Sequence, residues 1–291
     1  MDSPNSARMT ERGPVRIVCL TEETTEWLYM LRQEHKIVGI SGYTVRPPRA
    51  RIEKPKVSAF TSAKIDRILA LDPDCVFGFS DLQADIAATL IRSGIQVTIF
   101  NQRSIAQIIS MMAQVAAIVG QAVEGERLIA DIVTAMQAVA AQAEALDRAG
   151  VRRPVVYFEE WDSPHISAIQ WVSELIGMAG GIDCFAELGR MPMGRDRIIA
   201  DSAEIITRNP DIIVGSWCGK KFRADAVAAR LGWTEVAAVR NQELFEIKSP
   251  DILQPGPAAL TDGLRQLHRL INDWRKRHAL QPADAAPSVQ S

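Results

Sequence analysis

One long helical pattern in the middle of the chain constrains the fold most. Residues 121–149 contain no proline and a single internal glycine, Gly125. Apolar residues recur there at spacings of three and four, which places them on one face of a helix. These residues are Leu128, Ile129, Ile132, Val133, Met136, Val139, Ala143 and Leu146. Gly150 follows where a left-handed C-terminal cap is expected. At about 1.5 Å per residue, such a helix would be roughly 40 Å long, enough to span a domain.

The sequences on either side of this helix resemble each other. Residues 68–78 read ILALDPDCVFG, and residues 205–215 read IITRNPDIIVG. A helix end, a Pro-Asp pair, an apolar strand and a glycine follow in the same order in both. Each half also opens with a buried-strand pattern that leads into a helix containing a tryptophan, Trp27 or Trp171. A repeat of this length, present twice, predicts two similar lobes rather than a solenoid.

Strand patterns alternate with helical patterns in both halves, which predicts parallel sheets covered by helices. We therefore predict an α/β protein with two similar lobes, each with a central, mainly parallel sheet, joined by one long α-helix. The predicted organisation is a disordered N-terminus at 1–13, an N-terminal lobe at 14–118, a bridging helix at 119–150, a C-terminal lobe at 151–275 and a disordered tail at 276–291.

Composition excludes several classes of function. The formal net charge of −2 over 291 residues gives no electrostatic basis for nucleic-acid binding, and we expect a monomer. No stretch approaches the length of apolar sequence that spans a bilayer. The first thirteen residues lack the apolar region and cleavage site of a signal peptide, which predicts a cytoplasmic protein. The alternative is a periplasmic protein whose leader was removed or whose start is mis-assigned.

Signals for catalysis or metal binding are weak. The cysteines form no Cys-x-x-Cys pair, so neither zinc nor dithiol chemistry is expected. His165 has no second histidine nearby, which favours a helix-start or surface role over metal ligation. Glu159 and Glu160 are neighbours at a strand end and should point to opposite faces, which makes them a poor acid/base pair. We expect no catalytic residues, no metal and no intrinsic cofactor. The four cysteines are Cys19, Cys75, Cys184 and Cys218.

Aromatic residues follow the predicted strands in both halves. Ligands of open parallel sheets bind outside the carboxyl ends of the strands. Loop aromatics can simply cover a sheet end, but aromatics in equivalent places on two lobes favour a cleft for a large, rigid, partly apolar ligand. The candidate ligand-binding residues are Tyr43, Phe60, Phe79 and Ser80 in the first half, and Glu160, Trp161, Trp217 and Lys248 in the second.

Several short motifs occur in a characteristic order. They are RIVCLT at 16–21, TEWL at 25–28, PKVSAF at 55–60, IDRILALDPD at 65–74, ELIGMAGG at 174–181 and PGPAALTDG at 255–263. In this order, over about residues 15–274, the chain resembles the helix-bridged class of substrate-binding proteins of ABC importers, which bind vitamin B12 and ferric siderophores. It is most similar to the cobalamin-binding branch, because Tyr43, Phe60 and Phe79 match positions where that branch places aromatics against the corrinoid.

The resemblance implies non-enzymatic binding of a corrinoid, of cobalamin or cobinamide type, in a cleft between two lobes that close little. The chain would be the substrate-binding component of an ABC-type uptake system or a related leaderless corrinoid binder. The family docks on its permease through one carboxylate per lobe. Asp66 matches the first of these, whereas the repeat places Ala203 at the second, with Glu204 next to it.

Two other functions remain open at this stage. The first is binding of a ferric siderophore or another metal chelate, whose anionic oxygens would pair with cations near strand ends. The second is a cytosolic corrinoid-modifying enzyme with Glu160 as its acid or base. The cations that would meet an anionic chelate are Arg46, Arg103, Lys220 and Lys248.

Overall fold

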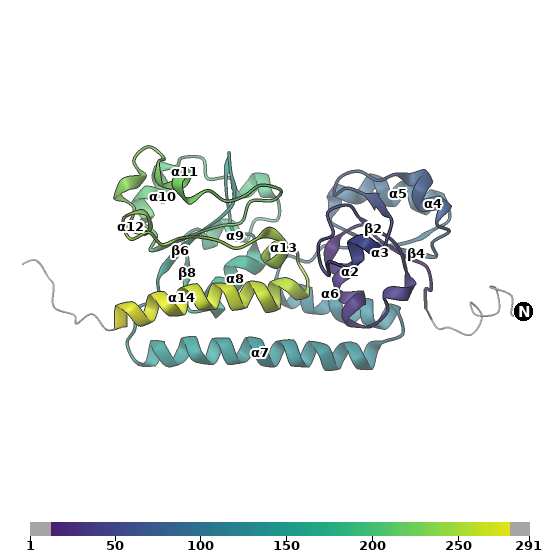
Figure 1. Ribbon diagram of the computed structural model, residues 1–291, viewed down its shortest axis with the longest axis horizontal. Helices are drawn as coiled ribbons and strands as arrows, with labels where there is room; N and C mark the ends of the chain where they lie inside the picture. Colours follow the sequence, from purple (N-terminus) through teal and green to yellow (C-terminus); the bar gives the residue numbers. More distant parts are fainter. Residues whose placement is uncertain (1–12, 280–291) are drawn as a thin grey trace, which may run out of the picture. The chain divides into compact units, whose positions relative to one another are not determined.

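The structure, a computed structural model, describes residues 13–279 and divides into two compact units (Figure 1). Of the described residues, 13–133 and 254–258 form unit 1, and 134–253 and 259–279 form unit 2. Almost all of the predicted disordered N-terminus, and the tail from residue 280, lie outside the described residues. The chain passes from unit 1 to unit 2 inside one long helix, as predicted. It then returns to unit 1 for residues 254–258, a second passage that the sequence did not indicate.

Unit 1 contains a five-stranded sheet in which every neighbouring pair is parallel, as predicted. The spatial order is β3-β2-β1-β4-β5. The central strands β1 and β4 are fully buried because both faces of the sheet are covered by helices. The strands are β1 (Ile17–Cys19), β2 (Ile37–Ser41), β3 (Lys56–Ser58), β4 (Cys75–Phe79) and β5 (Gln96–Phe100).

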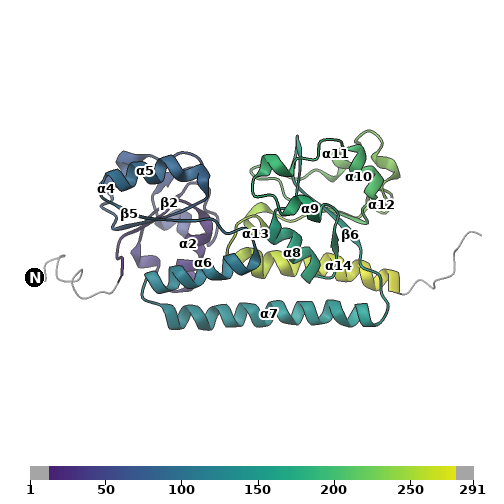
Figure 2. The same cartoon turned by 180° about the vertical axis from the view of Figure 1, so that it is seen from behind.

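Helices cover both faces of this sheet (Figure 2). On one face, the Trp27 indole in α2 donates to the Met112 carbonyl oxygen in α6 at 2.7 Å. On the other face, Ile68 of α4 and Leu90 of α5 pack with Val18 and Val76 of the sheet. The helices are α2 (Glu22–Met30), α3 (Ala50–Glu53), α4 (Ile65–Ala70), α5 (Ala84–Arg92) and α6 (Ile105–Ile118), with single 3-10 turns η1 (Glu34–Lys36) and η2 (Asp81–Gln83).

Unit 2 contains a second sheet, in the order β10-β9-β6-β7, with β8 also paired to β6. Only β7 is antiparallel to its neighbour. The first strand was expected to end at Phe158, but β6 continues through Asp162 because β7 folds back and pairs with its second half. The strands are β6 (Val155–Asp162), β7 (His165–Ser167), β8 (Ile182–Asp183), β9 (Ile212–Gly215) and β10 (Leu244–Glu246).

The helices of unit 2 also lie on both faces of its sheet (Figure 2). Helices α8 and α14 pack together on one face, and the shorter helices α10, α11 and α12 lie on the other. Helix α14 continues through Ala279, four residues past the boundary expected for the lobe. The elements are α8 (Gln170–Met178), α9 (Ala186–Gly189), η3 (Gly194–Arg197), α10 (Ala203–Arg208), α11 (Ala224–Ala228), η4 (Trp233–Glu235), α12 (Ala237–Arg240), α13 (Ser249–Ile252), the π-helical turn η5 (Ala259–Gly263) and α14 (Leu264–Ala279).

The long helix predicted from the sequence is α7 (Ala122–Arg148), which has 27 residues. Its second half runs beside α14 (Figure 1). Arg275 of α14, only 1% exposed, donates to the Ala143 carbonyl oxygen at 3.0 Å and to the Asp147 carboxylate at 2.6 Å. Hydrogen bonds from Arg153 and Arg275 hold the pKa of the Asp147 carboxyl below its usual value. A guanidinium thus fixes the end of α7 to the C-terminal helix.

We expect Trp171→Ala to lower the free energy of unfolding by about 3–5 kcal/mol, because it removes a large buried side chain and leaves a cavity. Trp171 is 2% exposed, as predicted, and its indole donates to the Ile252 carbonyl oxygen at 2.9 Å. Urea unfolding measures the effect, and Trp171→Phe, which keeps most of the volume, should lose less. Equal stability of the alanine variant and the wild type would show that Trp171 is not a core residue.

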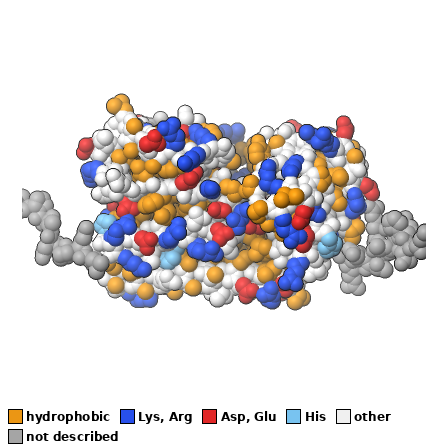
Figure 3. All heavy atoms as spheres, viewed as in Figure 1, with side chains coloured by type: hydrophobic (Ala, Val, Ile, Leu, Met, Phe, Trp, Pro, Cys, Tyr) orange, Lys and Arg blue, Asp and Glu red, His pale blue; other side chains and the backbone are white. Residues whose placement is uncertain are grey.

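The surface of the described residues carries charges of both signs. On the face shown in Figure 3, blue and red side chains are interspersed, in keeping with the net charge near zero. Among the helices within residues 13–279, none combines the length and the apolar character that crossing a membrane requires.

Candidate ligand-binding site

Two tryptophans of unit 2 both lie near one lysine, at the carboxyl ends of neighbouring strands. Trp161 lies near the end of β6, and Trp217 follows the end of the adjacent strand β9. The Lys220 ammonium lies 4.5 Å from the Trp161 ring centroid and 4.9 Å from the Trp217 ring centroid, within the range of cation–π attraction. Lys220 also forms an ion pair with Asp162. The structure therefore brings together Trp161 and Trp217, both predicted site residues.

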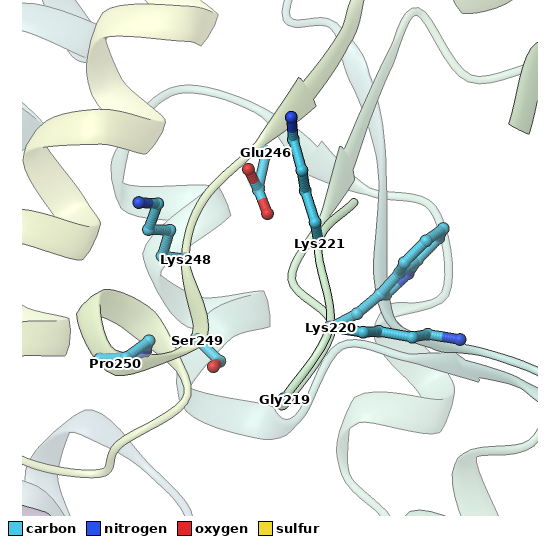
Figure 4. Close-up of a pocket in the computed structure, with 8 residues that line it drawn as sticks. Gly219, Lys220, Lys221, Glu246, Lys248, Ser249 and Pro250 are labelled. Carbon is cyan, nitrogen blue, oxygen red and sulfur yellow. The ribbon is translucent and has the colours of Figure 1, made fainter. Parts of the chain in front are cut away.

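A hollow of about 440 Å³ opens beside Trp217 (Figure 4). The loop after β9 forms one wall, and the end of β10 with the segment that follows it forms the other. Lys221 and Lys248 lie on either side of Glu246, whereas Lys220 extends away from it. With three lysines and one glutamate, the hollow carries a positive charge. Its lining residues are Trp217, Gly219, Lys220, Lys221, Glu246, Lys248, Ser249 and Pro250.

Trp217 is mostly a core residue. Its side chain is 6% exposed and belongs to the hydrophobic cluster of unit 2. The Phe222 ring packs edge-on against it, with a centroid separation of 5.0 Å. Its indole nitrogen donates to Glu159 Oε1 at 3.1 Å. A ligand in the hollow would therefore meet one edge of this indole, less than the open ring face expected from the sequence.

Glu159 organises the region behind Trp217. Its carboxylate is fully buried and accepts hydrogen bonds from Arg230 at 2.7 and 2.9 Å and from the Tyr157 hydroxyl at 3.0 Å. His165 Nδ1 lies 3.2 Å from Glu159 Oε2. Burial raises the pKa of this carboxyl, but hydrogen bonds and positive charge from His165 and Arg230 outweigh burial and hold it below the usual value. Glu159 therefore remains an anion in the core.

Sequence reasoning missed this cluster. Glu159 was treated only as a neighbour of Glu160, and His165 was assigned a surface or helix-start role. In the structure His165 lies on β7, which pairs with β6 and turns the ring toward Glu159. A glutamate that directly follows an apolar strand run was the available signal, because a carboxylate there needs a buried cation or hydrogen-bond donor.

Glu160 points to the opposite face from Glu159, as neighbouring residues on a strand do. Its carboxylate binds Arg197 through contacts of 2.6 and 3.1 Å, and Arg197 is 2% exposed. Glu160 does not line the hollow. A carboxylate held by a buried guanidinium in this way is poorly placed to act as the acid or base of a corrinoid-modifying enzyme.

In unit 1 the structure brings together two of the predicted aromatics. The Phe60 and Phe79 ring centroids are 6.4 Å apart, and the Arg103 guanidinium lies 5.0 Å from the centroid of Phe79. Phe79 is 6% exposed and Phe60 is half-buried. Tyr43, just past the end of β2, is 58% exposed. Ser80 is buried, and its hydroxyl accepts the Leu82 N–H at 3.2 Å.

Other predicted residues have different surroundings. Arg46, a candidate partner for an anionic ligand, forms an ion pair with Glu26 at 2.8 Å. Asp66 is exposed on α4, and Glu204 is exposed on α10 with its carboxylate 3.5 Å from Arg208. Their role in docking on a permease stays a prediction.

The remaining metal and thiol candidates form no cluster. Within residues 13–279, no group of three His, Cys, Asp or Glu side chains is placed to hold a metal ion. Cys19, Cys75 and Cys184 are buried free thiols, and burial raises the pKa of each to about 12. Cys218 is an exposed cysteine in the loop after β9.

Two α/β units with parallel sheets and aromatic side chains at the strand ends define a substrate-binding protein. The sequence pattern of the periplasmic binding protein family matches residues 17–250, and the chain belongs to this family. The family consists of substrate-binding proteins, which are not enzymes and deliver small molecules to the permeases of ABC transporters.

Two curated relatives align along nearly the whole chain. A vitamin B12-binding protein of Vibrio parahaemolyticus is 24% identical over 278 residues, which cover 94% of this chain and 95% of the relative. An uncharacterized ABC transporter substrate-binding lipoprotein of Bacillus subtilis, YvrC, is 22% identical over 278 residues, which cover 93% and 84% of the two chains.

Solved structures support the fold. The periplasmic vitamin B12-binding protein BtuF of Vibrio cholerae matches with a TM-score of 0.71 at 20% identity, covering 90% of this chain and 98% of that one. The periplasmic heme-binding protein BhuT, in complex with two hemes, matches with a TM-score of 0.75 at 20% identity, covering 89% and 98%. At these identities the likeness establishes the fold alone.

The predicted cytoplasmic location is wrong. The family is one of periplasmic binding proteins, and the Bacillus subtilis relative is a lipoprotein. Both findings point to an extracytoplasmic location. The prediction had rested on the composition of the first thirteen residues, which is a weaker guide to location than membership of this family.

Proposed function

We propose that the protein binds a corrinoid, of cobalamin or cobinamide type, as the substrate-binding component of an ABC-type importer. The observation that carries this proposal is the pair of tryptophans at neighbouring strand ends, Trp161 and Trp217, of which Trp217 lines the hollow of unit 2. The Vibrio parahaemolyticus vitamin B12-binding protein, similar along nearly its full length, supports the same ligand.

A corrinoid suits these side chains for a physical reason. Its macrocycle is a rigid, extended surface, and each 100 Å² of apolar area that it buries contributes about 2.5 kcal/mol. Tryptophan, tyrosine and phenylalanine offer large contact area with few rotatable bonds, so little side-chain entropy is lost on binding. In unit 1 the proposed contacts are Tyr43, Phe60 and Phe79.

We expect cyanocobalamin to release or absorb heat on titration into the protein, and Trp161→Ala to weaken its affinity about thirtyfold, the usual scale for an aromatic anchor. Trp161 is only partly buried and packs on the rim of the core cluster, so the variant should stay folded. Calorimetry measures the affinity, and Trp161→Phe, which keeps an aromatic ring, is the matched control. Failure of the folded wild type to bind cyanocobalamin would refute the proposal.

A second candidate ligand is a metal chelate with anionic side groups, such as a ferric siderophore or a carboxylate-bearing iron tetrapyrrole. The lysines of the hollow favour it, since Asp162 pairs with Lys220 and the remaining Lys221 and Lys248 outnumber Glu246. The Glu246 carboxylate also accepts the Phe222 N–H at 3.1 Å. Cobalamin has a largely neutral, amide rim and would gain less from these cations. The heme-binding protein BhuT, which has the same fold, is compatible with this class of ligand.

The two candidates respond differently to loss of the lysines. Lys221→Gln and Lys248→Gln should weaken binding of an anionic iron chelate, and added salt should weaken it further. The same variants should leave the affinity for cyanocobalamin nearly unchanged. Parallel titrations with cyanocobalamin and with an iron porphyrin distinguish the ligands, and tight binding of the porphyrin alone would replace the first candidate by the second.

Delivery to a permease would use exposed carboxylates. Asp66 on α4 and Glu204 on α10 are the proposed docking residues, because both are exposed at the starts of helices that correspond in the internal repeat. Each helix follows a strand-end segment and precedes a Pro-Asp pair in its own half.

A further inference from the structure

Gln83 joins the ends of two strands that are not neighbours in the sheet of unit 1. Its side chain is 0% exposed. The amide oxygen accepts the N–H of Phe79, the last residue of β4, at 2.9 Å. The amide nitrogen donates to the carbonyl oxygen of Phe60, which follows β3, also at 2.9 Å. Strands β2 and β1 lie between β3 and β4, so no ladder hydrogen bond can make this connection.

Gly78 and Ser80 allow the Gln83 side chain to lie against the end of β4. A Cβ atom on Gly78 would lie 2.7 Å from Gln83 Oε1 and 2.7 Å from Ile99 Cδ1, closer than real Cβ atoms approach other atoms. Ser80 has φ of +61°, a conformation that side-chain-bearing residues seldom adopt. Its N–H donates to the Phe100 carbonyl oxygen at 2.7 Å, which holds the turn against the end of β5. The turn at Ser80 places Gln83 within hydrogen-bonding distance of the Phe79 N–H.

The segment that carries Phe60 is folded by its own bonds, and Gln83 links it to β4. Ala59 N–H donates to the Ser62 carbonyl oxygen at 2.7 Å, and Ser58 bridges to Ala63. These bonds are internal to the segment. Ser58, two residues before Phe60, is also held by the Gly42 N–H, which donates to its carbonyl oxygen at 2.7 Å, but this bond joins the segment to the end of β2 and not to β4. The amide of Gln83 contacts the backbone of both aromatic residues, at the Phe79 N–H and at the Phe60 carbonyl oxygen.

We infer that Gln83 is a positioning residue that holds Phe60 and Phe79 in register for the ligand. The inference rests on the proposed function, in which these two aromatics contact the corrinoid. A ligand that meets a preorganised pair need not order the Phe60 segment when it binds, and ordering one such side chain costs up to about a tenfold loss of affinity. Gln83 would thus act on binding without touching the ligand.

Gln83→Met tests the inference, because methionine has a similar length and volume but lacks the amide. We expect cyanocobalamin affinity to fall about tenfold, because the Phe60 segment would then have to be ordered when the ligand binds. In a Phe60→Ala background the same substitution should have little further effect, since the Phe60 ring that the amide positions is gone. A crystal structure of the ligand-free variant should show the Phe60 ring displaced from its separation of 6.4 Å from Phe79.

A matched control is Gln33→Met. Gln33 is also a buried glutamine, and its amide donates to the carbonyl oxygens of Leu31 and Arg32. It precedes β2 and therefore lies near the opposite, amino-terminal edge of the sheet. Gln33→Met should lower stability and leave affinity unchanged, which separates loss of a buried hydrogen bond from loss of positioning.

A second variant, Gln83→Glu, retains an acceptor for Phe79 N–H and can donate to Phe60 only while protonated. Its affinity for cyanocobalamin should therefore fall as pH rises, whereas Gln83→Met should show no such added dependence. An unmoved Phe60 ring in Gln83→Met would overturn the inference without reference to any ligand. Wild-type cyanocobalamin affinity in Gln83→Met would also overturn it. The inference would fail as well if Gln83→Met caused the same loss of affinity in the Phe60→Ala background as in the wild type. Absence of cyanocobalamin binding by the wild type, with Phe60 displaced in the variant, would instead count against the proposed function alone.

Discussion

Trp217→Ala should lower the free energy of unfolding by about 3–5 kcal/mol and weaken cyanocobalamin binding about thirtyfold. Trp217 is 6% exposed in the core cluster of unit 2, so its removal leaves a cavity there. The substitution also removes one of the two aromatic rings that lie near the Lys220 ammonium. The buried Glu159 carboxylate loses one hydrogen-bond donor. Both stability and binding should therefore suffer, which distinguishes Trp217 from Trp161 on the rim.

Urea unfolding measures the first effect, and calorimetry on the folded fraction measures the second. Trp217→Phe is the informative control because it keeps an aromatic ring, while it removes the indole N–H and part of the ring volume. It should cost about 1–3 kcal/mol, the scale for leaving a buried polar group short of a partner. Trp171→Ala should match Trp217→Ala in stability and leave affinity per folded molecule unchanged. Wild-type affinity in Trp217→Ala would place the ligand away from the end of β9.

The sheets and the long helix could be predicted because their signals are local. Apolar runs such as residues 75–79 and 212–215 read as buried strands, and a helical stripe identifies α7 without knowledge of its partners. The repeat of a Pro-Asp pair before a strand and a glycine after it then indicated two similar lobes. These features need only neighbouring residues to form, so the sequence alone carries them.

The second half of β6 could not be predicted, because the side chains that satisfy its two glutamates are distant in the sequence. The sequence pattern places Glu159 and Glu160 at a strand end, yet the strand continues through Asp162 and pairs with β7. Two arginines make this possible: Arg230 satisfies Glu159 on one face, and Arg197 satisfies Glu160 on the other. Neither pairing has a local signature, since each joins residues that only the folded chain brings together.

The candidate site was predicted in part for the same reason. Strand-end aromatics could be located from where the strands stop, and the structure brings Trp161 near Trp217 and Phe60 near Phe79. Their burial could not be read from the sequence, because it depends on what packs behind them. The hydrogen bond between the Gln83 amide and the Phe79 N–H could not be predicted either. The only sign of it in the sequence is the glycine at position 78, where a side chain would collide with the amide.

Glu23, at the start of α2, is the clearest source of pH-dependent stability. It is 1% exposed, and its carboxylate accepts the Thr21 hydroxyl at 2.6 Å. Gly256 lies against it so closely that a Cβ atom there would come within 2.5 Å of the Glu23 Cβ. Burial raises the pKa of the Glu23 carboxyl to about 7, and the neighbouring charge of Glu22 adds to this, while the hydrogen bond from Thr21 opposes it.

The sign of the effect follows from proton binding. The folded state holds the Glu23 proton up to about pH 7, whereas the unfolded chain releases it near pH 4.3. The contribution of Glu23 to stability is therefore complete below about pH 4.3 and is lost as pH rises through about 7. A shift of this size corresponds to roughly 4 kcal/mol, at about 1.4 kcal/mol per pH unit.

Glu23→Gln should therefore be more stable than the wild type at about pH 8, by up to roughly 4 kcal/mol, with the difference shrinking toward about pH 5. Glutamine has nearly the same shape and remains neutral, so it escapes the cost of ionising a buried carboxyl. Urea unfolding of both proteins across this range measures the difference. Glu124→Gln is the control, because Arg127 lowers the pKa of that carboxyl and its removal should not stabilise the protein at high pH. If the stability difference between Glu23→Gln and the wild type stayed constant with pH, Glu23 would titrate normally. The buried carboxylate would then need a cation that the present contacts do not supply.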